Sequence, residues 1–197
     1  VVRPRGQGAY GNGAKVLNVD ESSIRNIPGA RVVRRGDFVG VVADREWDAV
    51  KAAQQLKVTW DMKPVLPGNS ALFEKMRAEQ TQDRIVQEKG NVANALSSAP
   101  HSVTQVGRGP YQMHAAFSPN CAIADVKAGA ALIISTTQDV YGTRASLARV
   151  IGIPAENIQV RYQEGASNYG HGCQDDVAQG AAIMSQITGK PVRLQFM

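Results

Sequence analysis

Residues 157–189 read NIQVRYQEGASNYGHGCQDDVAQGAAIMSQITG, and this pattern predicts a strand, a glycine-rich loop and a helix in that order. Residues 157–162 alternate apolar and polar side chains, as a strand with one buried face does. Asp175 or Asp176 then begins a helix that ends at Gly189, since an acidic residue favours a helix start and a glycine favours its end. Such an arrangement can present backbone N–H groups and the positive end of a helix dipole to an anion.

The loop at 163–176 holds a tyrosine, a histidine, a cysteine and two adjacent aspartates among its glycines. It matches neither GxGxxG nor GxxxxGK[ST], so it is not typical of a dinucleotide or triphosphate loop. His171 and Cys173 lack the second pair of ligands that a closed zinc site needs. Asp175 and Asp176 suit helix capping and a functional carboxylate about equally. From these residues alone we predict a loop that faces an anion or a cofactor.

The composition is that of an ordinary globular protein of one or two domains, with 43% hydrophobic and 20% charged residues among 197. The formal charge is +5, but 22 basic residues are mixed with 17 acidic ones. The densest basic run, Arg31–Arg35, is expected to be solvated surface, and nucleic-acid binding is not expected without a basic stripe and stacking aromatics. Cys121 and Cys173 have no CxxC spacing and are expected to be buried free thiols.

The N-terminal third predicts a small α+β unit. Alternation and turn residues predict, in order, a strand at 14–19, a turn at 27–30, a strand at 38–42, a helix ending at Leu56 and a strand through Val58 and Trp60. Asp44 is expected to cap the helix, because its carboxylate can accept from the first free N–H groups.

The rest of the chain predicts a connector followed by denser structure. The expected elements are a helix at 69–79, a polar connector to residue 100, a β-hairpin of 121–126 and 130–136, a helix at 143–151 and a strand at 191–197. The chain begins without a methionine and stops within that last strand. We therefore expect a piece of a longer polypeptide, or one chain of a split one.

Residues 135–138, STTQ, place a glutamine where the predicted strand at 130–136 ends. A side-chain amide offers donors and an acceptor at the carboxyl end of a strand, where ligands often bind in α/β structures. By itself, a glutamine there is more often a solvated polar residue. The stretch QMHAAFSPNCAIA at 112–124 predicts only a turn before a strand.

In combination, these stretches resemble the molybdenum-cofactor-binding large subunit of the xanthine oxidase, or molybdenum hydroxylase, family. That family has, in order, an EPHxxxA segment, a strand ending STQ, a helix closing on LG[VIL]P, a GGGFGG loop and a helix ending TGRPVR. The counterparts, in the same order and with similar spacing, are SPNCAIA at 118–124, STTQ at 135–138, VIGIP at 150–154, GASNYGHG at 165–172 and TGKPVRL at 188–194.

The stretch VVRRGDFVGVVADREWDAVKAAQQLKVTW at 32–60 is similar to the α/β-hammerhead domain that precedes the cofactor domain in that family. The resemblance implies an α+β fold with a partial hammerhead domain at 1–61, a connector at 62–100 and the first part of a molybdopterin-binding domain at 101–197. The start of the first domain and the end of the last are expected to lie outside this chain.

Carried over residue by residue, the resemblance implies that four residues bind the cofactor. Gln138 corresponds to the glutamine that hydrogen-bonds near the molybdenum oxo group. Tyr169 and Gly170 correspond to a Phe-Gly pair whose backbone approaches the cofactor, and a glycine allows that approach because it has no Cβ. His171 adjoins this pair and is expected to contact the cofactor, with no direct metal ligand in the chain.

The same correspondence leaves the substrate side incomplete. The family's substrate-orienting glutamate falls on Cys173, which has no carboxylate. Asp175 and Asp176 follow two and three residues later and are the candidates for a shifted substrate-side role. The family's catalytic base lies further toward the C-terminus, so this chain alone is not expected to be catalytic.

The pattern YGHxxxDD in place of FGGKE, with REWDA near residue 47, resembles the branch of isoquinoline 1-oxidoreductase, nicotinate dehydrogenase and bacterial membrane-linked aldehyde dehydrogenases. This implies oxidation of an aldehyde or N-heterocycle with water-derived oxygen and a molybdopterin cytosine dinucleotide cofactor. The implied partners are the remaining large subunit, a two-cluster iron–sulfur subunit and a cytochrome c. The expected location is the bacterial periplasm or membrane, with the cytoplasm as an alternative. The alternative function is a nucleotide- or phosphate-binding module that uses the loop at 163–176.

Overall fold

The computed structural model describes residues 1–4, 14–62, 68–112, 114–115, 119–165, 169–173 and 176–196. The chain divides into two compact units, one of residues 1–63 with 113–197 and one of residues 64–112. The first unit combines helices with antiparallel and parallel strands, which confirms the α+β class.

The C-terminal part of the first unit is a four-stranded sheet with helices on one face. Its strands, in the spatial order β7-β6-β5-β8, are β7 (Ile158–Tyr162), β6 (Ala130–Ser135), β5 (Cys121–Lys127) and β8 (Val192–Gln195). Only β6 and β7 are parallel. The helices α4 (Val140–Ile151) and α5 (Val177–Thr188) share one core with alternate residues of these strands. Ile133 and Leu147 are fully buried there, and the predicted hairpin is confirmed.

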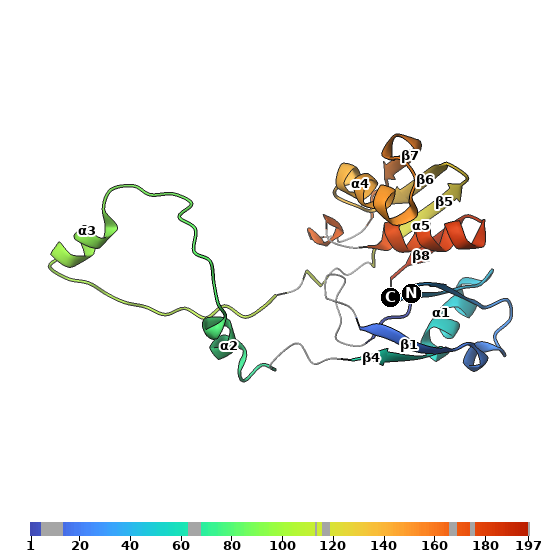
Figure 1. Ribbon diagram of the computed structural model, residues 1–197, viewed down its shortest axis with the longest axis horizontal. Coiled ribbons are helices and arrows are strands. Elements are labelled where there is room, and N and C mark those ends of the chain that lie inside the picture. Colours follow the sequence, from blue (N-terminus) through green and yellow to red (C-terminus); the bar gives the residue numbers. More distant parts are fainter. Residues whose placement is uncertain are drawn as a thin grey trace. The chain divides into compact units, whose positions relative to one another are not determined.

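The N-terminal part packs on the other side of α5 (Figure 1). Its elements are β1 (Lys15–Asp20), a 3-10 turn (Glu21–Ile24), β2 (Arg31–Arg35), β3 (Phe38–Val42), α1 (Glu46–Gln55) and β4 (Lys57–Asp61). The β2–β3 hairpin belongs to two cores, because Val33 faces α5 whereas Val39 and Val41 pack with α1. Gly40 lies so close to α5 that a Cβ there would be 3.2 Å from the Met184 Sδ.

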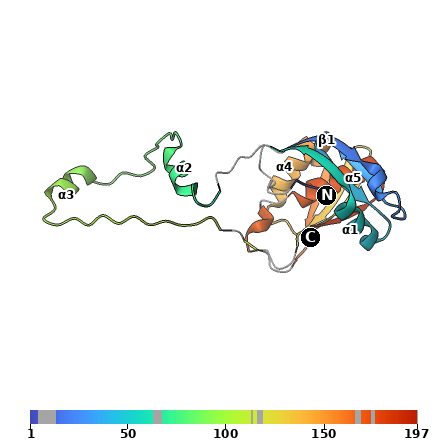
Figure 2. The same ribbon diagram turned by 90° about the horizontal axis from the view of Figure 1, so that it is seen from below.

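The second unit contains two short helices, α2 (Leu72–Ala78) and α3 (Val92–Ser98), joined by extended chain (Figures 1 and 2). None of its described residues is buried and most of its apolar side chains are exposed, so these residues form no core of their own. The helix α3 was not expected, and Asn91 caps it by accepting from the Asn94 N–H at 2.9 Å. No helix in the described part of the chain has the length and hydropathy of a membrane span.

Three helix starts differ from the predictions, and the helix expected from residue 69 begins at Leu72. Asp44 does not cap α1, which begins at Glu46 after Arg45 without any side-chain cap. The helix predicted from residue 143 begins at Val140, because the Asp139 carboxylate accepts from the Gly142 N–H at 2.8 Å. A Cβ on residue 142 would lie 2.1 Å from that carboxylate. Gly142 has a low helix propensity, but its missing side chain leaves room for the Asp139 cap.

The basic run at 31–35 is strand β2, not merely solvated surface. Arg35 reaches α4 and α5, donating to the Val150 carbonyl at 3.3 Å and to the Gln186 Oε1 at 2.7 Å. The Gln186 amide in turn donates to the Ile151 carbonyl at 2.9 Å. A cation at the C-terminal end of α4 also complements the helix dipole. Arg35 therefore connects the β2–β3 hairpin to α4 and α5 by hydrogen bonds.

We expect Arg35→Met to lower the free energy of unfolding by about 2 kcal/mol, since charged hydrogen bonds contribute roughly 1.5–3 kcal/mol each and methionine keeps much of the apolar stem. Thermal unfolding of the full-length protein measures the change. Arg34→Met is the matched control, because Arg34 is exposed and, among the residues that the structure describes, its side chain bonds only to the nearby Gly36 carbonyl. Equal melting of both variants would contradict the role given to Arg35.

Candidate functional site

The site begins where two parallel strands end together. Ser135 of β6 is paired with Tyr162 of β7, and the Gln163 N–H donates to the Ser135 carbonyl at 2.9 Å. The segments that follow, 136–138 and 163–165, therefore leave the sheet side by side. Carboxyl ends of parallel strands are the usual place for ligands in such sheets.

Gly165 brings these two segments into close approach. A Cβ at this position would lie 2.6 Å from the Thr136 Cγ2 and 3.4 Å from its Cβ, well inside normal contact. Thr136 is branched at Cβ and has little rotamer freedom with which to yield. The absence of a side chain at 165 is thus what lets residues 163–165 lie against the end of β6.

A single carbonyl ties the next part of the loop to the same strand end. The 3-10 turn His171–Cys173 presents the Gly172 carbonyl, which accepts from the Gln138 N–H at 3.4 Å and from the Thr137 hydroxyl at 3.3 Å. Thr137 is buried and also shares a hydrogen bond of 2.8 Å with the Thr143 hydroxyl in α4. Hydrogen bonds therefore connect the STTQ segment both to the turn at 171–173 and, through the Thr137 and Thr143 hydroxyls, to the first turn of α4.

The turn at Tyr169 and Gly170 has left-handed backbone geometry. The φ angles are 53° and 94°, a region that glycine tolerates and that a bulky residue rarely adopts. A Cβ on Gly170 would be 3.3 Å from the His114 Nε2, and the rings of His114 and His171 lie 5.6 Å apart between centroids. Tyr169 remains 63% exposed, so this turn offers its backbone and one aromatic ring at the surface.

Of the residues predicted to bind a cofactor, Gln138 and the Tyr169–His171 turn lie on adjoining segments, joined through the Gly172 carbonyl. The Gln138 side chain is exposed. Two supporting residues were missed in the sequence: Thr137, which anchors the turn, and His114, which lies beside Gly170. Neither residue could be identified from its neighbours in the sequence, because each contacts a residue far along the chain.

The acidic and cysteine residues are placed differently from some expectations. Asp176 precedes α5 but its side chain makes no capping bond; it pairs instead with the Arg3 guanidinium at 2.5 Å. Asp175 lies outside the described residues. Both cysteines are free, but Cys173 is exposed and Cys121 only half-buried, so their expected burial is wrong. Across the described ranges, no three His, Cys, Asp or Glu side chains are grouped to hold a metal.

The comparison with known families matches residues 76–196 to the molybdopterin cofactor-binding domain. This match includes both strand ends, the STTQ segment and the loop. The chain belongs to that family. Its likeness to the large subunit of molybdenum hydroxylases, expected from the five ordered motifs, is confirmed by the relatives that follow.

Two curated relatives cover most of this chain. A nicotinate dehydrogenase subunit from Pseudomonas putida is 39% identical over 188 residues, which are 93% of this chain and 16% of that protein. Xanthine dehydrogenase/oxidase of Felis catus is 28% identical over 163 residues, which are 80% of this chain and 12% of that protein. The chain thus spans less than a fifth of the length of either relative.

Solved structures share the fold. An aldehyde oxidoreductase from Desulfovibrio gigas matches with a TM-score of 0.70 at 19% identity, over 93% of this chain and 25% of that one. Quinoline 2-oxidoreductase from Pseudomonas putida matches with a TM-score of 0.64 at 19% identity, over 93% of this chain and 29% of that one.

Proposed function

We propose that this chain is the part of a molybdenum hydroxylase large subunit that holds the molybdopterin cofactor against the carboxyl ends of β6 and β7. The observation that carries the proposal is the connection between the two predicted cofactor segments. The Gly172 carbonyl accepts from both the Gln138 N–H and the Thr137 hydroxyl. The family match over residues 76–196 supports it.

The residues present fit such a cofactor. Gly170 has no side chain and a left-handed φ, so on the side that the His114 ring does not cover its backbone can approach a ligand closely. Gln138 presents an exposed amide on the adjoining segment, with two donors and an acceptor for oxo and amide groups. Together these groups suit a flat, polar cofactor held mainly by backbone and neutral side chains.

In this proposal each residue has a separate role. Gln138 hydrogen-bonds beside the metal centre, Tyr169 and Gly170 bring backbone to the cofactor, and His171 contacts it from the turn. None of the four is a direct metal ligand. The bound cofactor supplies the redox chemistry, which is oxidation of substrate with water-derived oxygen. Asp176, paired with Arg3, is proposed as a positioning carboxylate at the start of α5 and not as the catalytic base.

We further propose an aldehyde or N-heterocycle as substrate. Nicotinate dehydrogenase and quinoline 2-oxidoreductase are named for N-heterocycles and the aldehyde oxidoreductase for aldehydes, which supports both classes. The cofactor is proposed to be the cytosine dinucleotide form, with electrons passing to a two-cluster iron–sulfur subunit and then to a cytochrome c. Residues 1–61 are proposed to form a hammerhead domain, and the complex to act in the periplasm or at the membrane.

Gln138→Ala in the full-length subunit is expected to lower the turnover rate on the order of 10²-fold, a loss typical of removing one donor that stabilises developing charge. Molybdenum content is expected to stay within error of the parent protein, because the backbone contacts remain. Gln159→Ala in β7 is the matched control, since that exposed glutamine accepts a side-chain bond only from Arg161 within the described ranges. Unchanged turnover in Gln138→Ala would show that the residue does not contact the reacting centre.

A further inference from the structure

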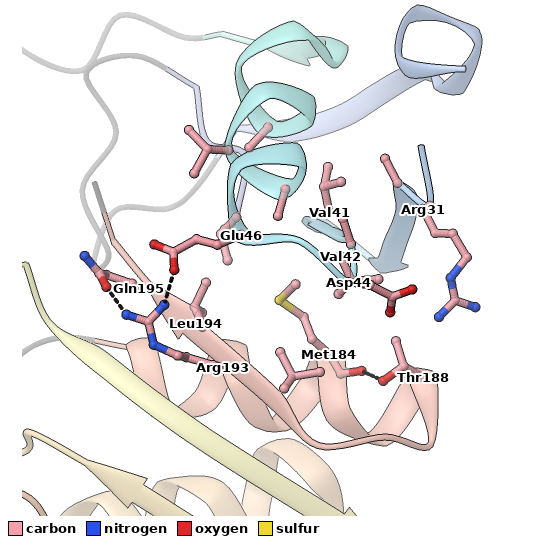
Figure 3. Close-up of a pocket in the computed structure, with 18 of the residues that line it drawn as sticks. Arg31, Val41, Val42, Asp44, Glu46, Met184, Thr188, Arg193, Leu194 and Gln195 are labelled. Carbon is pink, nitrogen blue, oxygen red and sulfur yellow. Dashed lines mark hydrogen bonds and ion pairs between the residues drawn. The ribbon is translucent and has the colours of Figure 1, made fainter. Parts of the chain in front are cut away.

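A groove of about 940 Å³ lies in the first unit, between β8 and the end of β3 (Figure 3). Every residue from 190 to 195 lines one wall, and residues 41–44 with one face of α1 line the other. Met184 of α5 points into it from between the walls. None of the residues proposed to hold the cofactor lines this groove, so it is a separate feature.

The β8 wall presents backbone groups that have no strand partner among the described residues. In an antiparallel strand, alternate residues direct both their N–H and C=O to opposite sides. The Phe196 N–H donates to the Asn120 carbonyl, so residues 192, 194 and 196 bond toward β5. Arg193 and Gln195 therefore direct their backbone groups away from β5, along the edge that lines the groove.

This edge has no strand beside it in the described residues, because β8 stands last in the order β7-β6-β5-β8. An unpaired edge is a template for another strand, and extended segments bind such edges through main-chain hydrogen bonds. The apolar side chains of Val42, Val50 and Met184 line the groove beside it. A strand lying there would gain both a hydrogen-bond ladder and an apolar contact.

The charges of the groove favour an acidic residue in the occupant. Arg193 pairs across the groove with Glu46 of α1 at 3.3 Å. Arg31 and Lys190 also line the groove, and within the part of the chain that the structure describes neither side chain forms an ion pair. Asp44 is the remaining acid, so two cations face one carboxylate.

We propose that an extended segment of the same large subunit, from outside these 197 residues, docks in this groove as a fifth strand beside β8. The inference rests on the proposed function as a large subunit. The matched stretch is only 16% of the nicotinate dehydrogenase relative, so a protein of that length has ample chain to supply the strand. The segment alternates apolar residues toward Met184 with polar ones, and carries an acid for Arg31 and Lys190.

Amide hydrogen exchange of the full-length subunit tests the pairing. The Arg193 and Gln195 amides are expected to exchange at least about 100-fold more slowly than unprotected amides, because they are hydrogen-bonded in a core sheet. The Leu194 amide, bonded to β5, is the protected control, and the Gly129 amide in the β5–β6 turn is the rapidly exchanging one. Rapid exchange at both 193 and 195 with slow exchange at 194 would overturn the proposal and leave a bare edge.

A photo-crosslinking residue introduced in place of Thr188, which lines the groove, identifies the occupant. A crosslink to a distant peptide of the same subunit supports the proposal, whereas a crosslink to another subunit, or none, contradicts it. Molybdenum measured in the same preparation separates the two claims. Rapid exchange of the edge amides in a molybdenum-loaded subunit would contradict only the docking proposal. A folded subunit without molybdenum would contradict the proposed function instead.

Discussion

Gly165→Ala is expected to remove most of the molybdenum from the full-length subunit, although it adds a single methyl group. That methyl would lie 2.6 Å from the Thr136 Cγ2, about 1 Å inside normal contact. Overpacking of this kind costs roughly 1–3 kcal/mol, or is relieved by moving the backbone. Here the backbone that moves carries Gln138 on one side and the loop on the other. If moving the two segments apart costs about 1.4 kcal/mol of binding free energy, the affinity for the cofactor falls about tenfold.

The double variant Gly165→Ala with Thr136→Ser supplies the control. Serine lacks the Cγ2 but retains the hydroxyl, which lies 3.5 Å from the Asn120 Oδ1. We expect Thr136→Ser alone to retain its molybdenum and the double variant to recover most of what Gly165→Ala loses. Molybdenum per protomer is measured by inductively coupled plasma mass spectrometry. Full loading of Gly165→Ala, or no recovery in the double variant, would contradict the close approach described here.

Ser185→Ala is expected to lower the free energy of unfolding by about 3 kcal/mol, although serine and alanine differ by one oxygen. The Ser185 hydroxyl is fully buried, accepts from the Val126 N–H at 3.0 Å and donates to the Lys190 carbonyl at 2.8 Å. The β5–β8 register ends at the pair of Ala124 with Val192. Continued by one step, the ladder would join Val126 directly to Lys190, so the hydroxyl bridges the gap where the strands diverge.

Removing that oxygen leaves the buried Val126 N–H without its partner, at a cost of about 1–3 kcal/mol. It also removes the 2.8 Å bond to the partly buried Lys190 carbonyl, which keeps only the longer 3.5 Å contact with the Thr188 hydroxyl. Thermal unfolding of the full-length subunit measures the loss. Thr188→Ala is the comparison on the same helix, because its hydroxyl donates to the Met184 carbonyl of the preceding turn at 2.8 Å and lies farther from the Ser185 and Lys190 carbonyls, at 3.3 and 3.5 Å. We expect that control to change stability by less than about 1 kcal/mol. Similar melting of the two variants would show that Ser185 does not bridge the strands.

The parts of the fold that the sequence predicts are those with strong local patterns. Strands β5, β6 and β7 alternate buried and exposed residues, and α5 ends at Gly189 with a φ of 69°, as its glycine indicates. Strand β2 was missed because Val33 is its only buried residue and arginines surround it. Its place depends on pairing with β3 and on Arg35 reaching two helices, which are contacts between distant residues.

The candidate site was likewise predicted from the sequence only in part. Gln138 and the loop at 165–172 were found through ordered motifs, whereas their physical connection through the Gly172 carbonyl has no signature in the sequence. His114 lies in a stretch that predicts only a turn, yet it stands 3.3 Å from where a Gly170 Cβ would be. Backbone approach, left-handed φ angles and buried hydroxyl bridges follow from tertiary packing, so local patterns do not reveal them.

The most direct test is the molybdenum content of the intact assembly, purified with the full-length large subunit. Holding molybdopterin between Gln138 and the Tyr169–His171 turn requires about one molybdenum atom per large subunit. We predict that stoichiometry in the folded complex, with the metal released together with its organic cofactor on denaturation. A folded, monodisperse assembly with less than about a tenth of an atom per subunit, even after expression with ample molybdate, would contradict this function.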